Sequence, residues 1–161
     1  MPYQIRPMRP DEYPLLDDFL YEAIFLPEGV EPPPRDIILD PALQVYVQGF
    51  GTAPADRCLC AEVDGKVVGA VWIRLMDDYG HLYADTPSLA ISLYPEYRAH
   101  GIGTALMQAI LDLAKRDGFP QISLSVQKKN YAVRLYKKVG FETVRETDEE
   151  YLMLWRAQKG C

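Results

Sequence analysis

The stretch Arg98-Ala99-His100-Gly101-Ile102-Gly103-Thr104 decides how this chain folds around a ligand. It follows an apolar run at 89–93 that favours a strand and begins an amphipathic run at 102–116 that favours a helix. Two glycines one residue apart at such a junction leave backbone N–H groups free to point outward. The start of a helix also carries about half a positive elementary charge from its aligned peptide dipoles. The stretch therefore predicts an anion site, and above all a phosphate site.

Patterns typical of strands and helices alternate on both sides of this stretch. Strands are expected at 3–6, 59–63, 66–75, 89–93, 121–126, 141–144 and 151–155, and helices at 14–24, 40–48, 102–116 and 130–139. Asp64-Gly65 suits a tight hairpin turn, whereas the proline-rich segment at 27–34 disfavours regular structure. Because strands and helices alternate from 89 to 139, a crossover between parallel strands is expected there, within a mixed α/β sheet.

The long helix at 102–116 is expected to bury one face against that sheet. The apolar residues that recur at helical spacing are Ile102, Ala105, Leu106, Ala109, Ile110 and Leu113. Asp117-Gly118 ends the helix, since glycine is favoured just after a helix C-terminus.

Composition limits the class of protein. The 161 residues carry a net charge of −6, with 48% hydrophobic and 25% charged residues, which is typical of one globular domain over 1–161. An acidic body is not attracted to nucleic acid or to an anionic membrane, so neither is an expected partner. No apolar run approaches the roughly 20 residues that cross a bilayer, and the first residues lack signal-peptide character, so a cytoplasmic location is expected.

The cysteines do not form a metal-binding pattern. Cys58 and Cys60 are two residues apart, and Cys161 is the last residue. With only His81 and His100 elsewhere, this set lacks the four ligands of a structural zinc site. We therefore expect reduced thiols and no metal.

Two common phosphate loops are excluded by single residues. A nucleoside-triphosphate loop needs Lys followed by Ser or Thr after its last glycine, but Gly103 is followed by Thr104-Ala105. A dinucleotide loop needs a third glycine three residues after the second, and that position is Leu106.

A third type of loop matches. The run from Arg98 to Gly103 fits the pattern [Gln/Arg]-x-x-Gly-x-[Gly/Ala] of the GNAT N-acetyltransferase superfamily. A second run, Asn130-Tyr131-Ala132-Val133-Arg134-Leu135-Tyr136-Lys137-Lys138-Val139-Gly140-Phe141, is similar to that superfamily's Asn…Leu-Tyr…Gly-Phe element. The resemblance is strongest from 88 to 141. It implies the GNAT fold, with helices on both faces of a mixed sheet, and acetyl-CoA as cosubstrate.

The resemblance also implies which residues hold coenzyme A. The strand before the loop would pair with the pantetheine arm through its main chain, and the loop would hold the pyrophosphate. The implied residues are Ile91, Ser92, Leu93, Arg98, Ala99, His100, Gly101, Ile102, Gly103, Thr104, Asn130 and Tyr136. Asn130 is also a natural helix N-cap, and it stands six residues before Tyr136 where many members of the superfamily have seven.

Tyr136 corresponds to the superfamily's tyrosine that is proposed as general acid toward the departing thiolate. The alternative is a core tyrosine packed beside Leu135. For the general base, Asp85 is the first candidate and Glu62 the second, although either can simply be a solvated surface charge. Members that acetylate N-terminal alanine carry a glutamate where this chain has Ser125, so that substrate is disfavoured.

The acceptor is expected to be a small cationic amine, because acids and aromatic residues gather in the segments that border the acceptor in this superfamily. These residues are Glu28, Glu31, Tyr46, Asp77, Asp78, Tyr79 and Tyr83. The expected reaction is direct acetyl transfer to a primary amine. The alternatives are a non-catalytic module that binds coenzyme A or acetyl-CoA, and a protein lysine acetyltransferase. The resemblance also implies a homodimer.

Overall fold

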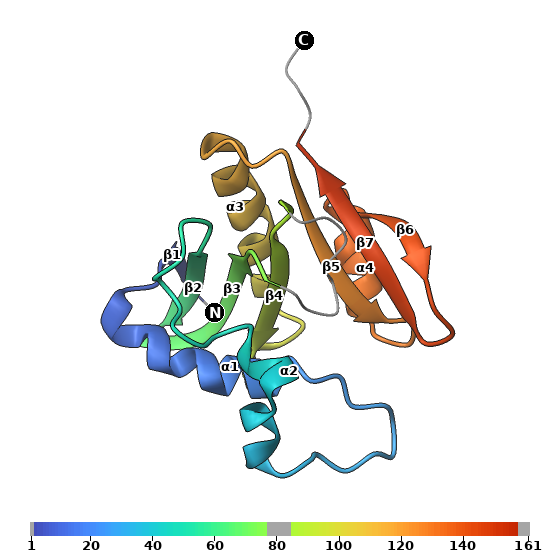
Figure 1. The fold of residues 1–161 in the computed structure, drawn as a ribbon. Coiled ribbons are helices and arrows are strands. Elements are labelled where there is room, and N and C mark those ends of the chain that lie inside the picture. Colours follow the sequence, from blue (N-terminus) through green and yellow to red (C-terminus); the bar gives the residue numbers. More distant parts are fainter. Residues whose placement is uncertain (1, 77–84, 158–161) are drawn as a thin grey trace.

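The computed structural model describes residues 2–76 and 85–157, and a seven-stranded sheet forms its centre (Figure 1). The strands are β1 (Gln4–Pro7), β2 (Arg57–Val63), β3 (Lys66–Arg74), β4 (Ser88–Leu93), β5 (Gln121–Gln127), β6 (Glu142–Glu146) and β7 (Glu150–Arg156). Their order across the sheet is β1-β2-β3-β4-β5-β7-β6. Only β4 and β5 pair in parallel, and the other neighbours are antiparallel. The expected mixed sheet and its crossover are confirmed.

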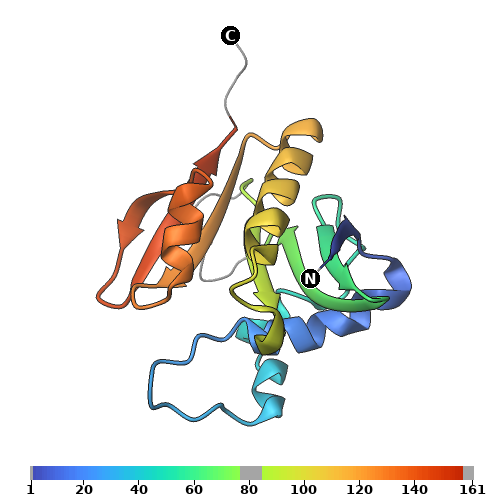
Figure 2. The ribbon, with the colours of Figure 1, turned by 180° about the vertical axis from the view of Figure 1, so that it is seen from behind.

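Helices cover both faces of this sheet, as expected. Helices α3 (Ile102–Arg116) and α4 (Ala132–Lys138) lie on the face that is in front in Figure 2. Helices α1 (Leu16–Glu22) and α2 (Pro41–Gln44) lie on the opposite face, in front in Figure 1. The described chain also has three 3-10 helices, η1 (Pro10–Leu15), η2 (Arg35–Leu39) and η3 (Pro95–Tyr97). The sheet therefore separates two hydrophobic cores.

Helix α3 has the expected bounds, and its buried face overlaps the expected one at Ile102, Leu106 and Ile110 but is rotated from it. The residues that are buried on it are Ile102, Leu106, Met107, Ile110, Leu111 and Ala114. The predicted Ala105, Ala109 and Leu113 are only half-buried. The sequence showed an apolar arc wider than the contact with the sheet, and only packing selected which part of that arc is covered.

The two helices before β2 are shorter than their apolar spacing suggested. The segment expected as helix from 14 begins as a 3-10 helix, because Pro14 lies inside it and has no N–H for an α-helical hydrogen bond. The expected helix at 40–48 ends at Gln44. Beyond it, the Tyr46 carbonyl accepts a hydrogen bond from Trp72 Nε1 at 3.0 Å. The segment after α2 is therefore held by side chains of β3.

A buried ion pair completes this attachment. Arg74 on β3 donates from Nε and Nη2 to the two carboxylate oxygens of Asp56, at 3.0 and 3.1 Å. The Arg74 side chain is 9% exposed and that of Asp56 is 1% exposed. Arg74 Nη1 also donates to the carbonyls of Val45 and Gln48 at 3.3 and 2.6 Å. Arg74 therefore fixes the segment from 45 to 56 against the sheet.

The sheet opens between its two parallel strands. Strand β4 pairs with β3 along its whole length, from Ser88 opposite Arg74 to Leu93 opposite Gly69. With β5 it has a single register pair, Ser88 opposite Ser123. The two strands diverge beyond that pair, so within the described residues one edge of β4 has no strand partner there (Figure 1).

The remaining expectations on composition concern thiols, metals and membranes. Cys58 and Cys60 are buried and free. Within 2–76 and 85–157, no three His, Cys, Asp or Glu side chains are grouped so that they could hold a metal ion. In the same ranges, none of the helices has the length and apolar character to span a membrane.

We predict that Asp56→Ala lowers the free energy of unfolding by about 3 kcal/mol, because it leaves the Arg74 guanidinium buried without its counter-charge. Urea denaturation measures this loss. The double variant Asp56→Ala/Arg74→Met is the control, and it should be more stable than Asp56→Ala alone because the uncompensated charge is gone. Equal stability of the single variant and the wild type would contradict the structural role of this pair.

Candidate functional site

The free edge of β4 presents backbone groups to the opening. The Tyr94 N–H donates to the Val68 carbonyl on the β3 side at 3.0 Å, so residues 90 and 92 also direct their backbone groups toward β3. Residues 91 and 93 therefore direct theirs toward β5. In the described part of the chain, no strand pairs with Ile91 or Leu93 on that side. This edge can accept an extended ligand with amide groups, as a sheet accepts one more strand.

The loop from 98 to 103 turns from β4 into helix α3 and exposes N–H groups. Ala99 has a φ of 63° and Gly101 a φ of 82°, so the backbone passes twice through the left-handed region. Gly101 is the N-cap of α3 and has no side chain that could cap the first N–H groups of the helix. These N–H groups and the helix dipole together favour an anion such as a phosphate.

Arg98 holds this loop in place. Its Nε donates to the Leu93 carbonyl at 3.1 Å, and its Nη2 donates to the carbonyl and to Oε1 of Glu22, both at 3.3 Å. The loop is thereby tied to the end of β4 and to the last residue of α1. The Arg98 side chain is thus engaged with protein groups, which leaves the expected phosphate contacts to the backbone N–H groups of the loop.

A cavity of about 830 Å³ lies along the opening. It is lined by Tyr21, Glu22, Ala23, Ile24, Phe25, Leu26, Pro32, Pro33, Ile91, Ser92, Leu93, Pro95, Arg98, Ala99, Gly101, Gly103, Thr104, Asn130, Tyr131, Ala132, Leu135 and Tyr136. We call it the donor cavity. All residues predicted to hold coenzyme A line it except two: Ile102 is buried in the core, and His100 is exposed beside the loop.

Sequence reasoning missed the wall formed by 21–26, Pro32 and Pro33. These residues come from the end of α1 and the proline-rich connection, and no local pattern relates them to the glycine loop. The structure brings them there because Ser92 Oγ donates to the Phe19 carbonyl at 2.6 Å and thereby fixes α1 across β4.

Tyr136 lies on α4 and is 8% exposed. Its ring packs against that of Phe141, with the ring centroids 6.1 Å apart. Burial raises the pKa of the Tyr136 hydroxyl to about 12. Among the described residues, the hydroxyl has no hydrogen-bond partner. It is a protonated donor at the boundary of the cavity, although the residue also packs in the core as the alternative interpretation required.

Asn130 has the capping role that its sequence position suggested. Its Oδ1 accepts a hydrogen bond from the Ala132 N–H at 2.9 Å, at the start of α4. It also lines the donor cavity, so capping and contact with a ligand are compatible here.

A second cavity of about 400 Å³ adjoins the first and is called the acceptor cavity below. Its lining is Leu20, Ala23, Ile24, Phe25, Leu43, Tyr46, Leu89, Ala90, Ile91, Ser125, Val126, Gln127, Asn130, Tyr136 and Glu150. Six of these residues also line the donor cavity, among them Ile91, Asn130 and Tyr136. The two cavities therefore meet where β4 and β5 separate.

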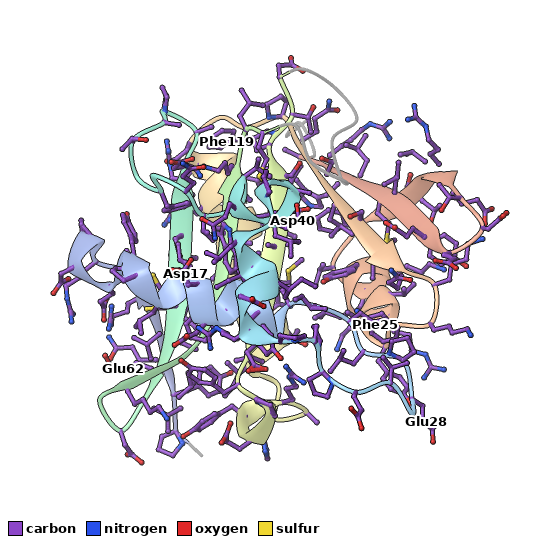
Figure 3. The ribbon with its side chains drawn as sticks, turned by 60° about the horizontal axis from the view of Figure 1, so that its bottom comes forward. Asp17, Phe25, Glu28, Asp40, Glu62 and Phe119 are labelled. Carbon is purple, nitrogen blue, oxygen red and sulfur yellow. The ribbon has the colours of Figure 1, made fainter. Side chains whose placement is uncertain are left out.

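Of the residues expected beside the acceptor, Tyr46 lines the acceptor cavity. Glu28 and Glu31 are exposed and line neither cavity. Figure 3 shows Glu28 at the outer bend of its loop, directed away from the sheet. The other expected residues, Asp77, Asp78, Tyr79 and Tyr83, lie outside the described residues.

Neither candidate base lines a cavity. Asp85 is exposed and precedes β4, near the end where Ser88 and Ser123 still pair. The Glu62 carboxylate accepts hydrogen bonds from Nε and Nη2 of Arg6 at 3.2 and 2.9 Å. Figure 3 places Glu62 on the opposite side of the molecule from Phe25, which lines both cavities.

The chain belongs to the Acetyltransferase (GNAT) family, whose model matches residues 18–141. It is 35% identical over 109 residues to the N-alpha-acetyltransferase of Sulfurisphaera tokodaii, which covers 58% of this chain and 65% of that protein. It is 39% identical over 88 residues to the probable N-acetyltransferase camello of Xenopus tropicalis, which covers 53% of this chain and 38% of that protein. The chain thus spans less than two thirds of these relatives.

Solved structures share the fold over the whole length. The PaiA N-acetyltransferase of Thermoplasma acidophilum, solved in complex with coenzyme A, has a TM-score of 0.70 at 20% identity, covering 98% of this chain and 100% of that chain. The putative acetyltransferase YncA of Salmonella typhimurium, solved with acetyl-CoA, has a TM-score of 0.70 at 16% identity. The match covers 100% of this chain and 97% of that chain. The GNAT fold expected from the two motifs is therefore confirmed.

We predict that Tyr136 makes stability fall as the pH rises from 10 to 12. An unfolded tyrosine loses its proton near pH 10, whereas burial holds the folded hydroxyl protonated to about pH 12. The stability that the protonated Tyr136 hydroxyl contributes is fully present below pH 10. It is lost as the pH rises toward the pKa of about 12 in the folded state. Urea unfolding of the wild type and of Tyr136→Phe measures the difference. Tyr94, whose pKa is also raised to about 12, remains in both proteins. Parallel pH profiles would contradict a buried phenol.

Proposed function

We propose that this chain is a single-domain, acetyl-CoA-dependent N-acetyltransferase that transfers an acetyl group directly to the primary amine of a small cationic molecule. The observation that carries the proposal is the opening between β4 and β5. A strand edge without a strand partner in the described chain, an N–H-rich loop and Tyr136 all border one continuous pair of cavities. Membership in the GNAT family supports the same chemistry.

The donor cavity suits the parts of coenzyme A. The backbone groups of Ile91 and the Leu93 N–H would pair with the amides of the pantetheine arm, and the first N–H groups of α3 would hold the pyrophosphate. Gly103 supports this assignment. A Cβ there would meet only Leu135 at 3.7 Å and Leu93 at 3.8 Å, which are ordinary contacts. Packing does not require a glycine at this position, whereas a closely approaching phosphate does.

The reaction needs a hydrogen-bond donor for each oxygen or sulfur that gains charge. As the amine nitrogen bonds to the thioester carbon, an N–H of the β4 edge would stabilise the carbonyl oxygen. The carbon–sulfur bond then breaks, and the sulfur takes the electron pair. Tyr136 gives a proton to this sulfur and regains one from water. The nitrogen releases its extra proton to water, because neither Asp85 nor Glu62 lines the cavities.

We predict that Tyr136→Phe lowers kcat about 100-fold, because general acids contribute on the order of 10²–10⁴ to such steps. The affinity for acetyl-CoA should change less than about twofold, since only a hydroxyl is lost. Release of free thiol over a panel of amines measures turnover, and calorimetry measures binding. Tyr3→Phe is the matched control, since Tyr3 precedes β1, is 40% exposed and lines neither cavity.

Three outcomes would contradict the proposal. Unchanged turnover in Tyr136→Phe would remove Tyr136 from the mechanism. Thermal stabilisation of the wild type by acetyl-CoA, without thiol release for any amine, would favour a non-catalytic coenzyme-binding module. Transfer to peptide lysines in preference to small amines would identify a protein lysine acetyltransferase.

We also predict that Gly103→Ala weakens acetyl-CoA binding about tenfold and leaves the melting temperature of the free protein within about 2 °C. The added methyl group has room in the protein but would occupy the space of the pyrophosphate. Calorimetric titration and thermal unfolding measure the two quantities. If Gly103→Ala lowered the melting temperature of the coenzyme-free protein by clearly more than about 2 °C, Gly103 would serve packing instead.

The proposal includes a cytoplasmic homodimer. The free, buried thiols of Cys58 and Cys60 are consistent with a reducing compartment. The dimer follows from the family resemblance, and light scattering in solution measures the mass that tests it.

A further inference from the structure

We infer that the acceptor cavity selects a compact aliphatic diamine, with Glu150 binding the ammonium group that does not react. This inference rests on the proposed function and specifies its substrate. Three observations support it: the charge of the cavity lining, the lack of an ion-pair partner for Glu150 among the described residues, and the contact between the two cavities.

The charge of the acceptor cavity comes from one carboxylate. Among the described lining residues, Glu150 is the charged side chain, and none is Lys, Arg or His. The other side chains are apolar, aromatic or neutral polar groups. An uncompensated carboxylate in a cavity with partly apolar walls attracts a cation more strongly than it would in bulk water. The cavity therefore favours a positively charged ligand.

Glu150 is also free to bind such a ligand. It begins β7, lies opposite Gln127 of β5 and is half-buried. Within the described residues, its carboxylate makes no ion pair or hydrogen bond, whereas the nearby Glu146 pairs with Lys128 Nζ at 2.7 Å. The neighbouring cation is thus already neutralised by another acid. Glu150 remains as the acceptor-cavity group that lacks a counter-charge.

The lining of the acceptor cavity connects this carboxylate to the place of reaction. Tyr136, Asn130 and Ile91 belong to both cavities, whereas Glu150 and Gln127 belong only to the acceptor cavity. Leu43, Tyr46 and Val126 are part of the same lining and offer apolar surface to methylene groups. A molecule with two amino groups on a short carbon chain satisfies both ends at once.

Two amino groups also suit the chemistry. The reacting nitrogen must be neutral when it attacks, and a nearby second positive charge lowers the pKa of the first ammonium group. The second nitrogen keeps its proton and pairs with Glu150. A volume of about 400 Å³ accommodates a small molecule of this kind rather than a folded protein segment.

The test compares unbranched diamines with monoamines of the same chain length, from three to six carbons. Thiol release gives kcat/KM for each amine. The wild type should prefer the best diamine over its matched monoamine about tenfold or more, as one charge-assisted pair provides. Glu150→Gln should remove most of that preference by raising the KM for diamines. Its turnover of monoamines and its affinity for acetyl-CoA should stay within about twofold.

Glu149→Gln is the matched control, because Glu149 is the adjacent acid, is exposed and lines neither cavity. It should keep the full diamine preference. A wild type that acetylates monoamines and diamines equally, or a Glu150→Gln variant that keeps the preference, overturns the inference and leaves the proposed function intact. Absence of turnover with every amine, despite acetyl-CoA binding, overturns both.

Discussion

The structure depends on one unmet requirement for hydrogen bonds, at the edge of β4 that faces β5. Backbone N–H and C=O groups need partners, and a seven-stranded sheet normally supplies them from the next strand. Here β4 and β5 share a single register pair. Within the described residues, the backbone groups of Ile91 and the N–H of Leu93 face the gap without a strand partner, and the Leu93 carbonyl accepts from Arg98. A ligand that carries its own amides is the natural partner for such an edge. The gap between β4 and β5 is also the place where the two cavities meet.

Elements on both faces are positioned by contacts around this gap. Arg98 connects the loop before α3 to Leu93 and Glu22, so the strand edge, the start of α3 and the end of α1 keep a fixed relation. Ser92 fixes α1 through the Phe19 carbonyl, and Arg74 fixes the segment that carries Tyr46. Apart from the short link between Arg98 and Leu93, each contact joins parts of the chain that are distant in sequence. The cavities are therefore products of tertiary packing, with walls taken from both layers.

Under the proposed function, each of the two cavities would hold one substrate of the direct transfer. The larger one has a long strand edge and an N–H-rich loop, which suit an extended phosphorylated cosubstrate. The smaller one carries the uncompensated charge of Glu150. Tyr136 lies in both linings, and its raised pKa keeps it protonated where the thiolate would form. A single buried phenol thus borders both cavities.

The sequence by itself determined the local elements and most of the loop and strand residues that line the donor cavity. The bounds of α3, the hairpin at Asp64-Gly65 and the glycine turn at 98–103 follow from short-range patterns, because periodicity and turn chemistry are local properties. Only the tertiary structure decided which face of α3 is buried, that residues 21–26 wall the donor cavity, and that Glu150 rather than Asp85 or Glu62 borders the acceptor cavity. Those outcomes depend on how far β4 and β5 diverge, and no residue spacing encodes the distance between two strands.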